Sequence, residues 1–368
     1  MEFFKEGAYG CVFRPGINCL GETEGLKYIT KIQIDEETSK NEIKIGEFME
    51  NTIRKQIPTY EDMFAPIISS CKISLGQIKN ETIKKCEIVQ RNYTTQNFVT
   101  NKIRYVGKNT LEPFLKTEYQ HNPSMFYKHF FQSHLYLLNS LFILSKYNII
   151  HYDLKQNNIS IDDTKRIPVI IDFGLSFRFK EDLITDLDYE NHFYLYYDKY
   201  PPWCLEIVII SFIVQQFKNV EHLQNTIRAN TNKKTKQKSS SNGIWKETII
   251  NINDLLDIID HYFKNNYVIL SIYSKEMKHS SKTKWMNLIK NEFNDKTGEY
   301  IVRFLMKSWD TWDNYSLCVI FLSLSRSFFP KNHKKYQQIL IETILATPLE
   351  RDTAINTTTK INTFIQTL

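Results

Sequence analysis

The sequence predicts an α+β fold, with a β-rich N-terminal part followed by a longer, mostly helical part. Residues 1–35 alternate short apolar runs with Gly and Pro, which is typical of β-hairpins. From about Asn109 onward the apolar residues recur with the spacing of helices. The chain of 368 residues suffices for one large core or two lobes, and its 42% hydrophobic and 24% charged residues are ordinary for a soluble globular protein.

The N-terminal elements follow in order from local patterns. Residues 37–53 have the apolar spacing of a helix. Two later runs, Ile67–Leu75 and Cys86–Tyr93, have the length and composition of strands. Gly107 interrupts the pattern after them, so we expect residues 105–108 to form a hinge.

The second part is expected to hold one strand among helices. Met125–Tyr147 predicts a long helix that leads into a loop at His151, and Ile167–Asp172 predicts a buried strand. The apolar runs Leu205–Phe217 and Leu317–Phe329 are broken or shorter than a membrane span requires. We therefore expect both to be buried helices, and we expect no membrane span.

Residues 207–309 are basic, with 16 Lys and Arg against 9 Asp and Glu, a net charge of +7 in a chain whose total is +6. Ile249–Tyr262 and Trp285–Leu305 have helical patterns, whereas Thr231–Gly243 has few apolar residues and is predicted to be disordered. No aromatic residue interleaves the four lysines of Lys233–Lys238, so a solvated loop is the simpler interpretation. Weak contact with nucleic acid through this basic insert stays open.

The cysteines and the N-terminus predict an intracellular protein. There is no CxxC spacing among the six cysteines, so we expect free thiols in a reducing compartment. A small bridge or metal site joining Cys19 and Cys71 stays open. Residues 1–6 are too short and too charged for a signal peptide, which favours the cytoplasm. The six cysteines are Cys11, Cys19, Cys71, Cys86, Cys204 and Cys318.

The most informative stretch is HYDLKQNN at residues 151–158, followed by DFG at residues 172–174. It places Asp153, Lys155, Asn158 and Asp172 on two adjacent loops. Phosphoryl transfer from ATP needs a base for the accepting hydroxyl, a cation for the γ-phosphate and oxygen ligands for Mg²⁺. An isolated DFG is a weak signal, but here it begins 19 residues beyond Asp153, as in the HxDLKxxN…DFG pattern.

On these residues the chain resembles eukaryotic-type protein kinases, and DLKxxN resembles the serine/threonine type. The resemblance implies that Asp153 is the catalytic base or orients the hydroxyl, and that Lys155 neutralises charge on the transferred group. It implies Asn158 and Asp172 as Mg²⁺ ligands, with Asn157 as the out-of-register alternative.

Upstream, GAYGCV at residues 7–12 resembles the last part of the kinase glycine loop, GxGxxGxV. The glycines would let backbone N–H groups approach the phosphates of ATP. Lys5 stands in place of the first glycine, so the match is partial. The ATP-binding residues that the resemblance implies here are Gly7, Ala8, Tyr9, Gly10 and Val12.

The resemblance also implies a lysine and glutamate pair. Lys31, on a predicted strand after the glycine loop, resembles the lysine that binds the α- and β-phosphates, with Lys27 as the alternative. Glu42, on the following helix, would pair with it, and Glu47 is the alternative. Phe173 would pack under the helix that positions Glu42.

Three further segments resemble structural motifs of the family. PPWCLE at residues 201–206 resembles the APE segment, with Glu206 as its acid. Asp313, in DNYSL, would cap the catalytic loop from below. Arg351, in TPLERDT, would form a buried ion pair with Glu206.

The resemblance therefore implies a two-lobed kinase fold, with an N-lobe over residues 1–104, a hinge at 105–108, and a C-lobe over 109–368 that includes an insert at about 210–309. It implies transfer of the γ-phosphate of ATP, with Mg²⁺, to serine or threonine of protein substrates. The long insert, the GAYGCVF loop and the YITK strand are similar to those of kinases from large cytoplasmic DNA viruses, so host cytoplasm or virion is the expected location. Oligomeric state does not follow from the sequence.

Two departures from the family pattern leave the activity open. Tyr152 replaces the arginine that binds a phosphate on the activation segment of many kinases, so we expect activity without that phosphorylation. Lys199 stands where serine/threonine kinases usually carry a threonine, so dual specificity stays open. The same fold could also serve as a pseudokinase-like scaffold or as a small-molecule kinase.

Overall fold

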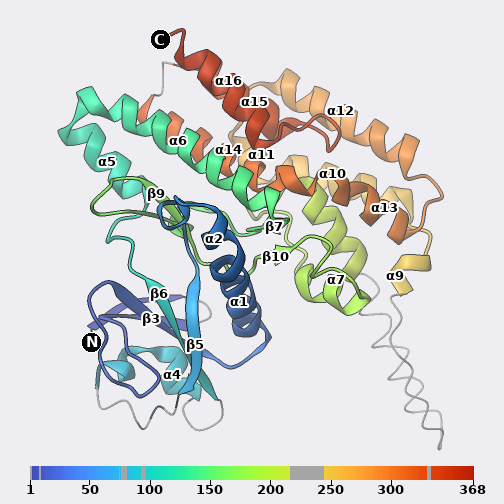
Figure 1. The fold of residues 1–368 in the computed structure, drawn as a ribbon. Coiled ribbons are helices and arrows are strands. Elements are labelled where there is room, and N and C mark those ends of the chain that lie inside the picture. Colours follow the sequence, from blue (N-terminus) through green and yellow to red (C-terminus); the bar gives the residue numbers. More distant parts are fainter. Residues whose placement is uncertain are drawn as a thin grey trace, which may run out of the picture. The chain divides into compact units, whose positions relative to one another are not determined.

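The computed structural model describes residues 2–7, 10–73, 75, 81–92, 97–215, 244–329 and 333–368. They form a mixed α+β structure, as expected (Figure 1). The chain divides into two compact units: unit 1 is Met1–Ile143 with Asp153–Phe177, and unit 2 is Leu144–Tyr152 with Arg178–Leu368. The expected lobe boundaries stay a prediction. Ala8, Tyr9 and Thr231–Gly243, with its lysine run, lie outside the described residues.

Unit 1 contains an antiparallel sheet of five strands in the order β1-β2-β3-β6-β5. The hairpins expected within residues 1–35 are confirmed, as is the strand expected from Ile67. The strands are β1 (Glu2–Gly7), β2 (Gly10–Arg14), β3 (Tyr28–Ile34), β5 (Ile67–Ile73) and β6 (Phe98–Arg104).

The helix expected over residues 37–53 is confirmed as α1 (Glu37–Phe48) continued by the π-helical turn η1 (Met49–Ile53), with α2 (Arg54–Gln56) after it. Glu36 and Ser39 form a capping box at its start. Figure 1 shows α1 running alongside β5. The two elements approach so closely that a Cβ on Gly46 would lie 2.4 Å from the carbonyl oxygen of Ile67, so glycine is needed at this contact.

The strand expected at Cys86–Tyr93 is wrong for the described residues, because they form the helix α4 (Glu87–Asn92), which follows the 3-10 helix η3 (Glu81–Lys85). Glu87 and Arg91 pair at i, i+4 across α4, 2.5 Å apart. The Glu6 carboxylate of β1 accepts the N–H groups of Glu87 and Ile88 at 3.4 and 3.3 Å. An acceptor at the first turn stabilises a helix, and this one comes from a distant strand.

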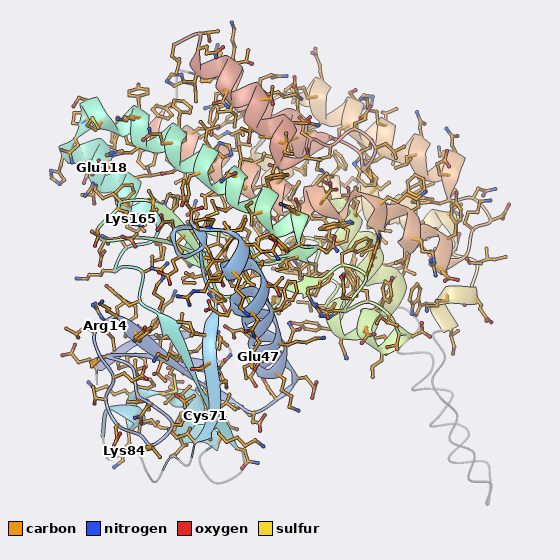
Figure 2. The ribbon with its side chains drawn as sticks, viewed as in Figure 1. Arg14, Glu47, Cys71, Lys84, Glu118 and Lys165 are labelled. Atoms are coloured by element: carbon orange, nitrogen blue, oxygen red, sulfur yellow. A yellow bond between two sulfur atoms is a disulfide. The ribbon has the colours of Figure 1, made fainter. Side chains whose placement is uncertain are left out.

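The expectation of free thiols is also wrong for four of the six cysteines. Cys11 on β2 forms a disulfide with Cys86. Cys19 forms a disulfide with Cys71 on β5, and Cys71 is labelled in Figure 2. The bridge between Cys19 and Cys71 that the sequence left open is therefore present. Sequence separations of 75 and 52 residues carry no local signal, and it is the sheet that brings these positions together. The buried thiols Cys204 and Cys318 are unpaired, as expected.

The rest of unit 1 contains, among the described residues, several helical segments and a small sheet. The helix expected at Met125–Tyr147 and the strand expected at Ile167–Asp172 are both confirmed. Strands β4, β9 and β8 pair in that order, with β8 and β9 antiparallel. These elements are α3 (Tyr60–Met63), β4 (Phe64–Ala65), α5 (Leu111–His121), α6 (Pro123–Lys146), whose last residues enter unit 2, η4 (Gln156–Asn158), β8 (Ile159–Ile161) and β9 (Pro168–Ile171).

Unit 2 is mostly helical, as expected. Residues 205–215 are helical, and Leu317–Phe328 lies within the buried helix α14 (Trp312–Phe328), whose C-cap is Phe329, so both expectations are confirmed for the described residues. The helix expected at Trp285–Leu305 is interrupted: Asp295 adopts a left-handed φ of 56°, and Thr297 starts a new helix. Among the described residues, no helix is long and apolar enough to cross a membrane.

The elements of unit 2, and those at its boundary with unit 1, are β7 (Ile149–Ile150), β10 (Phe177–Arg178), α7 (Asp186–His192), α9 (Ile244–Glu247), α10 (Ile252–Asn265), α11 (Tyr267–Ser271), α12 (Lys275–Glu292), α13 (Gly298–Leu305), η5 (Met306–Thr311), α14 (Trp312–Phe328), α15 (Lys334–Leu345) and α16 (Ala354–Ile365).

Candidate functional site

A buried ion pair joins β3 to α1 in unit 1. Lys31 Nζ lies 3.0 and 2.8 Å from the two carboxylate oxygens of Glu42. The side chain of Lys31 is 12% exposed and that of Glu42 is 3% exposed. Lys27 and Glu47 do not take part, because Lys27 is exposed and Glu47, labelled in Figure 2, is exposed on α1.

Burial and charge act in opposite directions on this pair. Burial alone would lower the pKa of Lys31, but the negative charges of Glu42 and Asp172 outweigh it and raise that pKa above its ordinary value. Burial raises the pKa of Glu42, and the opposing effect of Lys31 offsets only part of the increase. Lys31 is therefore held as a cation.

Two residues that the sequence analysis missed extend the network. Gln33 Nε2 donates to Glu42 at 3.0 Å, and Asn101 Nδ2 on β6 donates to Gln33 at 2.5 Å. Gln33 lies two residues after Lys31 on β3, so both side chains point to the same face, and Asn101 lies opposite Lys31 in the register. The period-2 rule along β3 is the signal that would have indicated Gln33.

Asp172 completes the cluster. Its Oδ1 lies 3.0 Å from Lys31 Nζ, and its side chain is 45% exposed. The residue adopts a left-handed φ of 64°, which Asp tolerates better than most residues. Asn41 on α1 donates to the carbonyl oxygens of Gly174 and Ser176 at 3.3 and 2.8 Å, which ties the DFG stretch to the helix that carries Glu42.

Phe173 anchors the same stretch from inside. Its side chain is fully buried, and its ring lies 6.3 Å from that of Phe64 in an edge-to-face arrangement. Phe64 belongs to β4, which pairs with β9 directly before the DFG stretch. The predicted contact of Phe173 with α1 stays a prediction.

A second cluster surrounds Asp153, also in unit 1. Lys155 Nζ lies 3.2 and 2.9 Å from its carboxylate oxygens, and Asn158 Nδ2 donates to Asp153 Oδ2 at 3.0 Å and to its carbonyl oxygen at 2.9 Å. Asp153 is 7% exposed and Asn158 is 4% exposed. Asn157 is exposed, so the structure places Asn158 rather than Asn157 in this cluster.

The register of one β-ladder explains how two distant candidates share one region. Ile159 on β8 lies opposite Ile170 on β9 in an antiparallel pair. Asn158 directly precedes Ile159, and Asp172 follows two residues after Ile170. Both therefore lie at the same end of the β8–β9 ladder.

The glycine loop is partly described. Gly7 and Gly10 face each other at the end of the β1–β2 hairpin, and Val12 pairs with Lys31, so the two side chains share one face of the sheet. A Cβ on Gly10 would lie 2.5 Å from the carbonyl oxygen of Ile32, so packing against β3 already demands glycine there. At Gly7 the nearest atom of the described residues, the carbonyl oxygen of Gly10, would lie 3.8 Å from such a Cβ, so packing makes no comparable demand there.

The expected hinge makes specific contacts. Asp163, missed by the sequence analysis, accepts the N–H of Lys108 and the hydroxyl of Tyr105, both at 3.2 Å. Gly107 is required by a close approach, because a Cβ on it would lie 1.9 Å from the carbonyl oxygen of Ile161.

In unit 2, Asp313 supports the backbone directly before Asp153. Its carboxylate accepts the N–H groups of His151 at 2.6 Å and Tyr152 at 3.0 Å. Burial raises the pKa of Asp313, and the hydrogen bonds from His151 and Tyr152 oppose that rise. Tyr152 adopts a left-handed φ of 68°, which is unusual for a bulky residue and is found where surrounding structure imposes it.

The ion pair expected between Glu206 and Arg351 is confirmed. Two parallel contacts of 2.5 and 3.0 Å join the guanidinium to the carboxylate, and both side chains are 1% exposed or less. Arg351 also donates to the carbonyl oxygen of Ala346 at 3.0 Å. A bidentate pair of this kind holds the segment before Ile207 to the C-terminal part of the unit.

Comparison with known proteins adds no family: neither a model of a known protein family nor a curated protein matches the chain. Unit 1 contains a buried cation held by two carboxylates, and a carboxylate held by a lysine and an amide. Such a set can bind an anionic group and polarise a hydroxyl.

Proposed function

We propose that the protein is an ATP-dependent protein kinase that transfers the γ-phosphate to serine or threonine hydroxyls, and that it has the two-lobed kinase fold. The observation that carries the proposal is the joining of Lys31 to both Glu42 and Asp172. A lysine held as a cation beside an exposed carboxylate suits phosphate oxygens and a magnesium ion together.

The residues present fit Mg²⁺. The amide nitrogen of Asn158 is engaged by Asp153, which leaves its Oδ1 oxygen as the atom for a cation. The carboxylate of Asp172 is 45% exposed and offers a second oxygen ligand. Hard oxygen donors of this kind are what Mg²⁺ prefers.

ATP with Mg²⁺ supplies a phosphoryl group whose charge is partly neutralised. Lys31 would bind the α- and β-phosphates, and Gly7 and Gly10 would leave room for their oxygens beside the β1–β2 hairpin. Asp153 would accept or orient the proton of the substrate hydroxyl, while Lys155, already beside it, would neutralise charge on the transferred group. Each role needs only positioning and charge, as phosphoryl transfer requires.

The test is transfer of labelled phosphate from ATP–Mg²⁺ to a mixture of basic and acidic proteins, with identification of the phosphoamino acid. Wild type should transfer label, and Asp153→Asn should lose at least about 100-fold, because the base is removed. Asp257→Asn makes the same change on the exposed face of α10 and should leave transfer within about twofold of wild type.

The products decide the finer points. Phosphoserine or phosphothreonine supports the proposal as stated. Phosphotyrosine would replace serine/threonine specificity with dual specificity, as the presence of Lys199 in place of the usual threonine allows. Equal activity of Asp153→Asn and wild type would overturn the assignment. A folded wild type that binds ATP without transferring label would favour the pseudokinase-like scaffold. Similarity to kinases of large cytoplasmic DNA viruses stays a prediction.

A further inference from the structure

Helices α9, α10 and α11 of the basic insert contact one segment of unit 2 at several points. That segment, residues 185–203, lies between the DFG stretch and Glu206 and includes α7. Among the described residues of the insert that contact it, we name five the clamp residues: Trp245, Lys246, His261, Tyr262 and Asn266.

The first contacts are with α7. Lys246 forms an ion pair with Asp186, in the first turn of the helix. The ring of Trp245, which is 2% exposed, lies 5.5 Å from that of Tyr189. Both partners come from α9, so this short helix contacts α7 through a charge and through a buried aromatic surface.

The second contacts are at the other end of the segment. His261 Nδ1 on α10 is hydrogen-bonded to the Asp198 carboxylate. Asn266 Nδ2 donates a hydrogen bond to the Asp198 carbonyl oxygen at 2.9 Å. The Tyr262 hydroxyl donates to the carbonyl oxygen of Trp203 at 3.3 Å. Asp198 is 6% exposed and Asn266 is fully buried, so the hydrogen bond between these two residues is protected from water.

Tyr152 fills the place where many kinases carry an arginine. Its side chain is 3% exposed, and its ring lies 5.8 Å from Phe193 and 5.1 Å from Trp203. Trp203 Nε1 also donates to the carbonyl oxygen of Tyr152 at 3.0 Å. At this position the segment packs against an aromatic ring, whereas the arginine of many kinases binds a phosphate on this segment.

We propose that the clamp residues hold residues 185–203 in one conformation without phosphorylation, and that His261 and Asn266 are positioning residues for the protein substrate. The inference rests on the proposed kinase function, and it gives the basic insert a role. Ordering of this segment is a step that kinases commonly control by phosphorylation. Here the same chain supplies the contacts, so the segment is ordered as soon as the protein folds.

The test is hydrogen exchange of residues 185–203 in protein treated with a phosphatase, with intact mass confirming that no phosphate remains. The segment should already be protected in wild type. Exchange as fast as that of a free peptide of the same sequence would overturn the proposal. Amides of α14, which is buried, report on global stability and should be unaffected by each variant below.

His261→Ala is the first variant, because the His261 side chain is 56% exposed and its removal should leave the fold intact. Exchange over residues 193–203 should rise about three- to fivefold, as expected for a partly exposed pair. His261→Asn should restore protection, because its amide can donate from near the position of Nδ1. His279→Ala, on the exposed face of α12, is the matched control and should change nothing.

Asn266→Asp is the second variant. Aspartate keeps the N-cap acceptor that now receives the N–H groups of Val268 and Ile269, but it cannot donate to the Asp198 carbonyl oxygen. Exchange over residues 193–203 should rise about tenfold. Asn251→Asp makes the same change at the N-cap of α10, away from the segment, and should stay within about twofold of wild type.

Kinetics separate positioning from a general loss of structure. His261→Ala and Asn266→Asp should lower kcat/KM for the protein substrate by the same factors by which they raise hydrogen exchange. KM for ATP should stay within about twofold of wild type, because the residues proposed to bind ATP belong to unit 1. Unchanged exchange in both variants would overturn the clamp even if wild type transfers phosphate. A wild type without transfer overturns the kinase proposal, while the exchange data still decide whether the clamp holds.

Discussion

Replacement of Lys31 by Met tests the buried network from which the function is inferred. Methionine keeps the apolar stem of the side chain and removes the charge. Glu42, with a side chain that is 3% exposed, would then keep Gln33 as its hydrogen-bond donor among the described residues. Breaking a buried ion pair by removing one partner costs about 3–5 kcal/mol.

Protonation of Glu42 limits that loss and makes it depend on pH. Protonating a carboxyl of ordinary pKa near 4.3 costs about 3.7 kcal/mol at pH 7 and about 1 kcal/mol at pH 5, at 1.36 kcal/mol per pH unit. We therefore expect Lys31→Met to lower the free energy of unfolding by about 3–4 kcal/mol at pH 7 but only about 1 kcal/mol at pH 5.

The sign agrees with the pKa of Glu42, which burial already raises in the folded protein. A carboxyl with a raised folded pKa contributes its full stability below its ordinary pKa, and that contribution is lost as the pH rises through the folded pKa. Without Lys31 the folded pKa rises further, so the loss of stability extends from about pH 4.3 upward toward neutral pH.

The assay is urea unfolding followed by tryptophan fluorescence at pH 5 and pH 7. Lys27→Met is the matched control, because Lys27 is exposed on the same stretch of chain, and it should change stability by less than about 0.5 kcal/mol. The reasoning is refuted if the two variants behave alike, or if the loss in Lys31→Met is the same at both pH values.

Three further predictions concern stability. Arg351→Met should lower the free energy of unfolding, measured with urea, by about 3–5 kcal/mol, because it leaves the buried Glu206 carboxylate without its partner. The double variant with Glu206→Leu should recover most of that loss. A single variant as stable as wild type would contradict the buried ion pair. Asp313→Ala leaves two buried backbone N–H groups without their acceptor and should cost about 2–4 kcal/mol in the same assay, and a loss below about 1 kcal/mol would contradict the contacts. The Cys19–Cys71 disulfide closes a loop of 52 residues, which stabilises the fold by about 4 kcal/mol. Replacing both cysteines by serine should therefore lower Tm by roughly 10 °C. Dithiothreitol should lower the Tm of wild type by reducing this disulfide, an effect that the double-serine variant lacks.

The sequence by itself determined the elements whose signal is local. Four predictions from local apolar patterns were confirmed: the hairpins within residues 1–35, the helix after Glu36, the long helix before His151 and the strand before Asp172. The roles proposed for Asp153 also rest on sequence, because the spacing of the motif is a property of the chain. Periodicity works for the helices and hairpins because each buries one face, and the spacing of apolar residues records which face that is. The strand before Asp172 was indicated by a short, continuous apolar run, because its residues are buried on both faces.

Which partner a side chain meets was decided by the tertiary structure. Glu42 and Glu47 are five residues apart, which places them about 140° apart around α1, and only the docking of the helix on β3 and β5 decides that Glu42 faces Lys31. Cysteine pairing was missed for the same reason, since Cys11 and Cys86 meet only after the sheet has formed.

The helix α4 and the contacts of the insert also depend on distant segments. Residues 87–92 are helical where a strand was predicted, with an acceptor at the first turn supplied by Glu6, which lies 81 residues upstream of Glu87. His261 reaches Asp198 across 63 residues. A local sequence pattern reflects burial and backbone preference, but it does not identify partners that are distant in the sequence. These contacts form, and stabilise the protein, only after folding has brought the distant segments together.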